Sequence, residues 1–315
     1  MSGTLKDPRK AFSDALMEIG KENPRVLAVS CDSASGSGMS DFLKTYPERY
    51  VEVGISEQNA IDVSAGLAER GFIPVISAIA PFISMRCYEQ VRNDVGYSKM
   101  NVKVIGSSSG LSHSTLGSSH QAVEDMCLMR SIPNMVILNP GDYYEVQMSL
   151  KKAVEYDGPV YIRMPRHAAE DVAPAEKRNF EIGKAEVLSR GSDVTLIATG
   201  TLVNEAQKAA EALKARGISA GVVNMCTVKP LDMDAVLSSY KNSRLLVTIE
   251  EHSVVGGLGG AVAEAIAPLK GGAPLQILGI AEGAVNVGPY RELLESYSLT
   301  GEKLADSVYQ FYQKI

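Results

Sequence analysis

A glutamate stands where a strand-like segment of the sequence turns into a helix-like one. In Val-Glu-Val-Gly-Ile-Ser-Glu-Gln-Asn-Ala (51–60), Glu57 follows an apolar stretch and a Gly-Ile-Ser turn. Small or apolar residues then recur at helical spacing, at Ala60, Val63 and Leu67. The helix dipole stabilises an acid in a first turn by about 0.3–1 kcal/mol, so a purely structural role is open. A carboxyl group at this point can also exchange a proton with a ligand.

Histidines are concentrated in one loop. The stretch GSSSGLSHSTLGSSHQ (106–121) consists mainly of glycine and serine, and it holds His113 and His120, two of the four histidines of the chain. Either histidine alone could be a solvated loop residue, but the pair favours function. Ligands of parallel sheets bind beyond the carboxyl ends of the strands. We therefore expect Glu57 and this loop at the same edge of a sheet.

The elements that must position these side chains follow a strand–helix alternation. Helix-length stretches such as 83–97 and 141–155 separate apolar segments that are apolar on both faces. The predicted strands are residues 26–30, 50–53, 74–79, 102–106, 135–139 and 159–164. This pattern predicts a mostly parallel sheet that is covered by helices on both sides.

A second, smaller α/β unit is predicted in the C-terminal part. The charged segment 166–186 contains a proline and is typical of a linker. Further strand-like segments follow at 193–200, 217–225, 244–251 and 274–281. The sequence therefore predicts two doubly wound α/β domains, residues 1–166 and 187–315, which the linker 167–186 joins.

Composition excludes several classes of protein. With 45% hydrophobic and 22% charged residues, the 315-residue chain has the composition of a soluble globular protein. Its net charge of −6 provides no basic field for nucleic acid or an anionic membrane, and its apolar runs are too short to span a bilayer. The four scattered cysteines and the absence of a signal-peptide pattern favour a cytoplasmic location. P-loop, HExxH and GxSxG motifs are also absent.

Long stretches of the sequence resemble the transketolase family, in the same order along the chain. The segment around Glu57, GISEQNAIDVSAGLAERGFIPV, is similar to the pyrimidine-binding segment of thiamin-diphosphate enzymes of the transketolase and deoxyxylulose-phosphate synthase group. Other matching stretches are PFISMRCYEQVRNDV (81–95), GSSHQAVEDMCLMRSIPNMVILNPGD (117–142), DGPVYIRMPR (157–166), VTLIATGTLVNEA (194–206), VKPLD (228–232) and VTIEEHSVVGGLGG (247–260).

The resemblance implies roles around the cofactor thiamin diphosphate. The family glutamate that Glu57 matches hydrogen-bonds a ring nitrogen of the aminopyrimidine, and it favours the tautomer that deprotonates the thiazolium carbon. An apolar crevice would favour the neutral acid that can donate this proton. Phe82 matches the aromatic residue that stacks on the pyrimidine, and Asp32 matches an aspartate near the cofactor. Ile79 stands where relatives often have another aromatic residue, which predicts an aliphatic wall.

The resemblance also implies roles at the substrate. His120 matches a histidine that contacts the reacting oxygens of the sugar and can relay protons. Arg166 and Arg9 match arginines that bind a sugar phosphate, for which the guanidinium fork is suited. For Arg9, an ordinary surface charge is an equally good interpretation.

Two expected substrate contacts are missing from this sequence. Gly106 replaces the phosphate-site histidine of the family, and its sugar-hydroxyl aspartate falls near Leu116. His113 is the candidate that replaces a lost contact. The resemblance therefore leaves open which sugars are used and whether they are phosphorylated.

Transketolases are about twice as long as this chain. Their N-terminal half binds the diphosphate and a magnesium ion through a GDG…N motif, whereas the only Gly-Asp pair here, at 141–142, is followed by tyrosine. The resemblance thus implies the C-terminal subunit of a split transketolase, complete from Met1 and inactive alone. We expect a separate N-terminal subunit to supply the ligands of Mg²⁺, in an α2β2 heterotetramer that transfers a two-carbon ketol unit between sugars of the pentose phosphate pathway.

Two alternatives have the same domain order or composition. One is the β subunit of a 2-oxoacid dehydrogenase, and the other is a catalytically silent binding module that regulates a sugar-phosphate enzyme. The loop ending SSHQAVEDMCLMRSIPNM and the VKPLD stretch favour transketolase over the dehydrogenase. The presence of Glu57, Phe82 and His120 together argues against a silent module.

Overall fold

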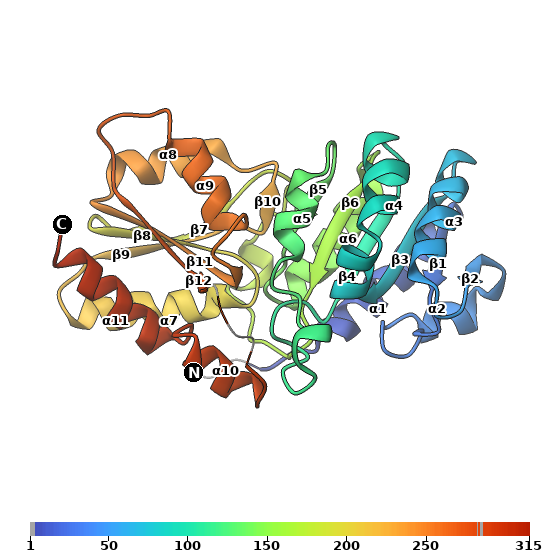
Figure 1. Ribbon diagram of the computed structural model, residues 1–315, viewed down its shortest axis with the longest axis horizontal. Helices are drawn as coiled ribbons and strands as arrows, with labels where there is room; N and C mark the ends of the chain where they lie inside the picture. The colour runs from blue at the N-terminus through green and yellow to red at the C-terminus, as the bar shows by residue number, and fades with distance from the viewer. Residues whose placement is uncertain (1–3, 282, 284–285) are drawn as a thin grey trace.

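The computed structural model describes residues 4–281, 283 and 286–315, which form two α/β lobes side by side (Figure 1). The first lobe has a seven-stranded sheet in the order β10-β5-β6-β4-β3-β1-β2. All its neighbouring strands are parallel except β10, which is antiparallel to β5. The strands are β1 (Val26–Ser30), β2 (Tyr50–Glu52), β3 (Ile73–Ile79), β4 (Lys103–Ser107), β5 (Val136–Leu138), β6 (Val160–Met164) and β10 (Thr227–Lys229).

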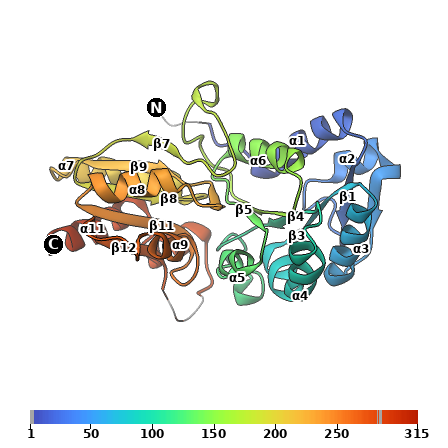
Figure 2. The ribbon, with the colours of Figure 1, turned by 90° about the horizontal axis from the view of Figure 1, so that it is seen from above.

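Helices cover both faces of the first sheet (Figure 2). One face carries α1 (Pro8–Glu22), α2 (Ser40–Thr45) and α6 (Tyr143–Glu155), and the other carries α3 (Glu57–Glu69), α4 (Tyr88–Gln90) and α5 (Asp125–Ser131). Each face has its own apolar core, because the strands are buried on both sides. The predicted fold class is confirmed in this lobe.

The second lobe has a smaller sheet, in the order β12-β11-β8-β9-β7, which is parallel except for β7. Its strands are β7 (Glu186–Ser189), β8 (Val194–Ala198), β9 (Ala220–Asn224), β11 (Leu245–Ser253) and β12 (Leu275–Ile280). The helices α7 (Leu202–Ala215) and α11 (Gly301–Tyr312) cover one face, and α8 (Met233–Asn242) and α9 (Leu258–Ile266) cover the other (Figure 1). The short helix α10 (Tyr290–Ser296) lies towards the first lobe. No helix within the described residues is long and apolar enough to cross a lipid bilayer.

The stretch 83–97 is not the single α-helix that its length suggests. It consists of a π-helix, Phe82–Arg86, then the short α4, then a second π-helix, Val91–Tyr97. The wider π turns are rare and are frequent at functional sites. A second difference is β10, which follows β9 of the second sheet but pairs with β5 of the first. The VKPLD stretch therefore ties the two lobes together.

The segment predicted as a linker makes specific contacts at several points along its length. Ala169 forms a β-bridge with Lys6, and the backbone N–H of Val172 donates to Asp142. Arg178, whose side chain is 2% exposed, pairs with Asp142 and Glu145 of the first lobe, and with Glu186 at the start of β7. Three carboxylates thus share one buried guanidinium.

Replacing Arg178 tests how much this junction stabilises the chain. Arg178→Met should lower the free energy of unfolding by about 3–5 kcal/mol, because Asp142 and Glu145 stay buried without their counter-ion. Urea unfolding followed by circular dichroism measures the change. The control Arg190→Met removes an exposed arginine and should cost less than about 0.5 kcal/mol. Equal effects of the two variants would contradict a structural role for Arg178.

Candidate active site

Glu57 is the first residue of α3, and the turn before it is fixed by a second glutamate. The Glu52 carboxylate accepts hydrogen bonds from the backbone N–H groups of Asp32, at 2.7 Å, and of Gly54, at 2.8 Å. Although burial opposes the shift, these hydrogen bonds lower the pKa of Glu52 below its usual range. Gly54 has a φ of +73°, a conformation that favours glycine. The turn therefore delivers Glu57 to the carboxyl edge of the sheet, where it is only 6% exposed.

We had expected an apolar crevice around Glu57, but a charged side chain lies against it. Arg86, the last residue of the first π-helix, donates to Glu57 Oε2 at 2.8 Å. The same guanidinium lies over the ring of Phe82, with its Cζ 4.3 Å from the ring centroid. Arg86 thus joins the predicted proton-transfer residue to the predicted stacking residue, and no motif in the sequence had indicated it.

Aromatic and imidazole rings continue this row of side chains. The Phe82 and His120 rings meet edge to face with their centroids 5.1 Å apart, and His120 meets His113 in the same way at 5.6 Å. A serine neighbour, Ser119, lies within hydrogen-bonding distance of His120 Nδ1, at 2.9 Å. The structure therefore brings Glu57, Phe82, His120 and His113 into one continuous row at the edge of the sheet.

An arginine and three imidazoles lie near one another at the far end of this row. Burial, and after it electrostatic repulsion from Arg166, His120 and His167, lowers the pKa of His113 to about 4. Arg166 lies 3.5 Å from the hydroxyl of Ser108, beside the same loop. His113 is therefore neutral at pH 7, with a guanidinium and two further imidazoles around it.

His167 is a residue of this site that the sequence analysis missed. Its Nε2 lies 3.1 Å from the carbonyl oxygen of Ser112, and its ring stacks on Tyr290 at a centroid distance of 4.1 Å. The available signal was its position directly after Arg166, beside a predicted phosphate ligand. The stacking partner comes from the second lobe, so it could not have been found from local spacing.

The histidine loop is held firmly, despite a composition that suggests flexibility. The backbone N–H of Leu111 donates to Glu251 Oε1 at 2.7 Å. At Gly110, where φ is +62°, a side-chain carbon would lie 2.4 Å from the same oxygen, so glycine is required. Gln121, 1% exposed, donates to the carbonyl oxygens of Ser114 and Asn286. The loop is therefore anchored to the second lobe at both ends.

The structure explains why the family histidine is absent at position 106. A side-chain carbon on Gly106 would lie 2.2 Å from the hydroxyl oxygen of Tyr161, a fully buried residue of β6. That hydroxyl donates to Asp125 Oδ2 at 2.7 Å and cannot easily move. Leu116, the other departure, is 53% exposed and contributes no polar group.

The remaining predicted residues lie around the row with fewer contacts. Ile79 ends β3 and is half-buried, three residues before the first π-helix begins. Asp32 is exposed in the turn after β1 with a φ of +52°, so its turn-forming role is evident. Arg9 pairs with Asp7 at 3.1 Å in the first turn of α1, and no contact among the described residues joins it to Arg166.

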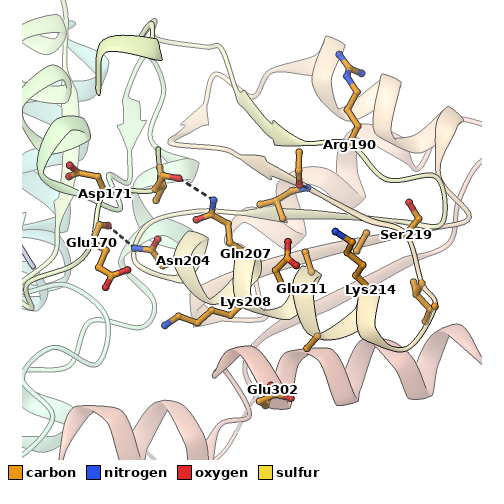
Figure 3. Close-up of a pocket in the computed structure, with 18 residues that line it drawn as sticks. Glu170, Asp171, Arg190, Asn204, Gln207, Lys208, Glu211, Lys214, Ser219 and Glu302 are labelled. Atoms are coloured by element: carbon orange, nitrogen blue, oxygen red, sulfur yellow. Dashed lines mark hydrogen bonds between the residues drawn. The ribbon is translucent and has the colours of Figure 1, made fainter. Parts of the chain in front are cut away.

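A cavity of about 1090 Å³ lies elsewhere, between α7 and the segment 170–172 (Figure 3). Lysines and glutamates alternate along it, and it contains none of the side chains predicted for the site. Such mixed charge indicates no particular ligand. Among the described residues, no group of three or more His, Cys, Asp or Glu side chains is placed to hold a metal ion.

Comparison with known proteins accounts for nearly the whole chain. The family model for "Transketolase, pyrimidine binding domain" matches residues 6–171, and the model for "Transketolase, C-terminal domain" matches residues 183–304. A putative transketolase C-terminal section of Methanocaldococcus jannaschii is 41% identical and covers 100% of this chain and 99% of its own length. An apulose-4-phosphate transketolase subunit of Phocaeicola vulgatus is 36% identical, with 100% of both chains covered. A 6-deoxy-6-sulfo-D-fructose transketolase subunit of a Clostridium species is 37% identical and covers 97% of this chain and 94% of its own.

Two solved structures are similar over almost the entire chain. One is described as a split-gene transketolase in an inactive β4 tetramer, with a TM-score of 0.88, 39% identity and 98% of each chain covered. The other is a transketolase of Campylobacter jejuni with a TM-score of 0.83. The match covers 98% of this chain but only 47% of the Campylobacter jejuni chain. At 19% identity, that second likeness shows the fold alone. The chain belongs to the transketolase family, which depends on thiamin diphosphate, and carries its pyrimidine-binding and C-terminal domains.

The coupling between Arg166 and His113 can be measured directly. Arg166→Ala should raise the pKa of His113 from about 4 by about one pH unit, because a nearby positive charge no longer opposes protonation. Proton NMR of the His113 ring against pH reports the value, with Arg190→Ala, an exposed arginine of the second lobe, as the control. An unchanged His113 pKa in Arg166→Ala would show that the two groups are not neighbours in solution.

Proposed function

We propose that this chain is the C-terminal subunit of a two-chain transketolase that transfers a two-carbon ketol unit from a ketose to an aldose. The observation that carries the proposal is the row from Glu57 through Phe82 to His120, at the carboxyl edge of the sheet. These residues come from three separate segments of the chain, and each matches a family position with its own role. A silent regulatory module would have no need for this arrangement.

The donor set at the Glu57 end fits an aminopyrimidine. The Arg86 guanidinium contacts both the Glu57 carboxyl group, which is 6% exposed, and the Phe82 ring. One planar ring of similar size can therefore reach both. Thiamin diphosphate, when bound, supplies the carbanion and the electron sink that breaking a carbon–carbon bond requires. In our proposal, Glu57 holds a proton at the ring nitrogen and Phe82 stacks on the ring. Ile79 forms an aliphatic wall, and Asp32 lies in the turn beside the cofactor.

The other end of the row is suited to the sugar. We assign His120 to the reacting oxygens, because it is the imidazole in contact with Phe82. Arg166 and His113 would bind the distal anionic group, with Arg9 as an additional contact. Two relatives are named for apulose-4-phosphate and for 6-deoxy-6-sulfo-D-fructose, which carry a phosphate and a sulfonate. A guanidinium beside an imidazole that can donate a hydrogen bond fits either anion, so we expect an anionic sugar substrate.

A second chain is part of the proposal. This chain spans only about half of a one-chain transketolase, 47% in the structure from Campylobacter jejuni. A solved relative, with 98% of each chain covered, is described as a split-gene transketolase in an inactive β4 tetramer. We therefore assign the diphosphate-binding domain and the ligands of Mg²⁺ to an N-terminal partner subunit, in a cytoplasmic α2β2 assembly that serves the pentose phosphate pathway.

Reconstitution tests the proposed division of labour. The chain alone should show no ketol transfer, and adding the N-terminal subunit with thiamin diphosphate and Mg²⁺ should restore it. The measurement is a coupled assay with an anionic ketose donor and an aldose acceptor. Glu57→Gln should assemble normally but lower the rate by about 10²–10⁴, since it keeps the shape and loses the transferable proton.

Three results would contradict this proposal. Robust turnover by the isolated chain would disprove the need for a partner. Decarboxylation of 2-oxoacids with reduction of a lipoyl acceptor would favour the dehydrogenase alternative. Activity of Glu57→Gln within a few-fold of wild type would reduce Glu57 to a helix-end charge.

Substrate recognition can be separated from chemistry by two further variants. Arg166→Ala should raise KM for a phosphorylated donor by about ten- to a hundredfold with little change in kcat, because a remote anion is bound equally in ground and transition states. The unphosphorylated donor hydroxypyruvate should be nearly unaffected. His120→Ala should lower the rate with both donors, because it acts at the reacting carbons. Equal losses on both donors in Arg166→Ala would show that Arg166 does not bind the anion.

A further inference from the structure

The side chain of Arg86 contacts both residues that we propose to bind the cofactor ring, Glu57 and Phe82. The Arg86 guanidinium donates to Glu57 Oε2 at 2.8 Å, and its central carbon lies 4.3 Å from the centroid of the Phe82 ring. A guanidinium is planar, carries N–H groups at its edge and stacks on aromatic faces. These are also the features of an aminopyrimidine, which presents an exocyclic N–H group and a flat aromatic face.

Proton chemistry makes the two occupants mutually exclusive. A carboxylate paired with a guanidinium accepts hydrogen bonds only, so it has no proton to place on the unprotonated nitrogen of an aminopyrimidine ring. The role proposed for Glu57 requires that proton. Arg86 and the aminopyrimidine therefore compete for the same place beside Glu57. They also require different charge states of Glu57, the carboxylate for Arg86 and the neutral acid for the aminopyrimidine.

The local structure allows Arg86 to leave. Its side chain is 47% exposed, whereas that of Glu57 is 7% exposed, so the arginine can reach solvent without rearranging the core. Arg86 is also the last residue of its π-helix, four residues after Phe82. Without another partner, however, Glu57 would be a buried charge with no counter-ion, which is unfavourable. The arginine therefore returns whenever the ring is absent.

We propose that Arg86 occupies the place of the aminopyrimidine in the unpartnered chain and must be displaced when the cofactor binds, so that Arg86 limits the cofactor affinity of this subunit. The inference rests on the proposed function, because it takes Glu57 and Phe82 as the ring-binding pair. Its consequence is that the chain alone binds the ring weakly. The contacts of the diphosphate with the partner subunit would supply the free energy that displaces the arginine.

Calorimetric titration of the full chain with the free hydroxymethyl aminopyrimidine half of thiamin tests the competition without any activity assay. Arg86→Met should bind this probe about tenfold more tightly than wild type, equivalent to about 1.4 kcal/mol, because a long apolar side chain leaves Glu57 and Phe82 available. The matched control is Arg92→Met, an exposed arginine of the same segment whose guanidinium lies 4.7 Å from the Tyr97 ring. Arg92→Met should bind the probe like wild type.

Salt provides a second arm that does not depend on a mutation. Raising the ionic strength from about 0.05 M to about 0.5 M screens a half-exposed ion pair. The probe should be largely uncharged at pH 8, so salt should not screen its own binding. The affinity of the wild-type chain for the probe should therefore rise with salt, while the affinity of Arg86→Met should stay constant. Unchanged affinity of wild type across this range would contradict the competition.

The outcomes separate this inference from the proposed function. Equal or weaker binding of the probe by Arg86→Met, in a variant that melts within a few degrees of wild type, overturns the competition and makes Arg86 a support of the site. If Arg86→Met binds tightly and adding Glu57→Ala removes that binding, both proposals stand. If Glu57→Ala leaves the tight binding unchanged, Glu57 does not bind the ring, and the proposed function and this inference fail together.

Discussion

A single buried carboxylate of the second lobe holds the histidine loop of the first. Glu251, 3% exposed, accepts hydrogen bonds from the backbone N–H of Leu111, the hydroxyl of Thr201 and the hydroxyl of Tyr290. The loop has almost no regular secondary structure, so its buried backbone groups need partners of this kind. The backbone carbonyl oxygen of Glu251 in turn accepts from Arg163, whose guanidinium pairs with Asp125 of α5. Because breaking such a network leaves buried groups unpaired, the two lobes behave as one unit at the site.

This anchoring fixes one of the two ends of the site. At one end, the row begins with the Glu57 carboxylate, and at the other it reaches Arg166 and His113. The Glu57 end is built on a helix start and a tight turn of the first lobe. The Arg166 end depends on the anchored loop and on His167, which stacks on Tyr290 from the second lobe. In the proposed enzyme, the cofactor ring would meet the carboxyl group of Glu57 and the sugar anion would meet Arg166, because the two lobes fix opposite ends of one row.

The sequence predicts the parts of this arrangement that depend on local pattern. The strand at 26–30 matches β1, and the other predicted strands agree with the observed ones to within a few residues, because apolar runs between helices reflect burial on both faces of a sheet. Glu57 and the two histidines stood out because of their position after strands. Arg86, His167 and Glu251 did not, because their partners are distant in sequence or depend on side-chain direction. The π-helices were missed as well, since an apolar pattern does not distinguish a π turn from an α turn.

The departure from the family pattern at Gly106 has a physical origin in how the sheet is filled. Tyr161 occupies the space next to Gly106 and is held there by Asp125, so β4 has no room for a side chain at position 106. The nitrogen-bearing side chains near that position come instead from the loop and from the residues that follow β6, namely His113, Arg166 and His167. A ligand group on a strand is fixed by the sheet, whereas one on a loop is only as well fixed as the loop's anchors. In this chain, substrate specificity would therefore depend on Glu251 and Tyr290, which lie in the second lobe and need never touch the substrate.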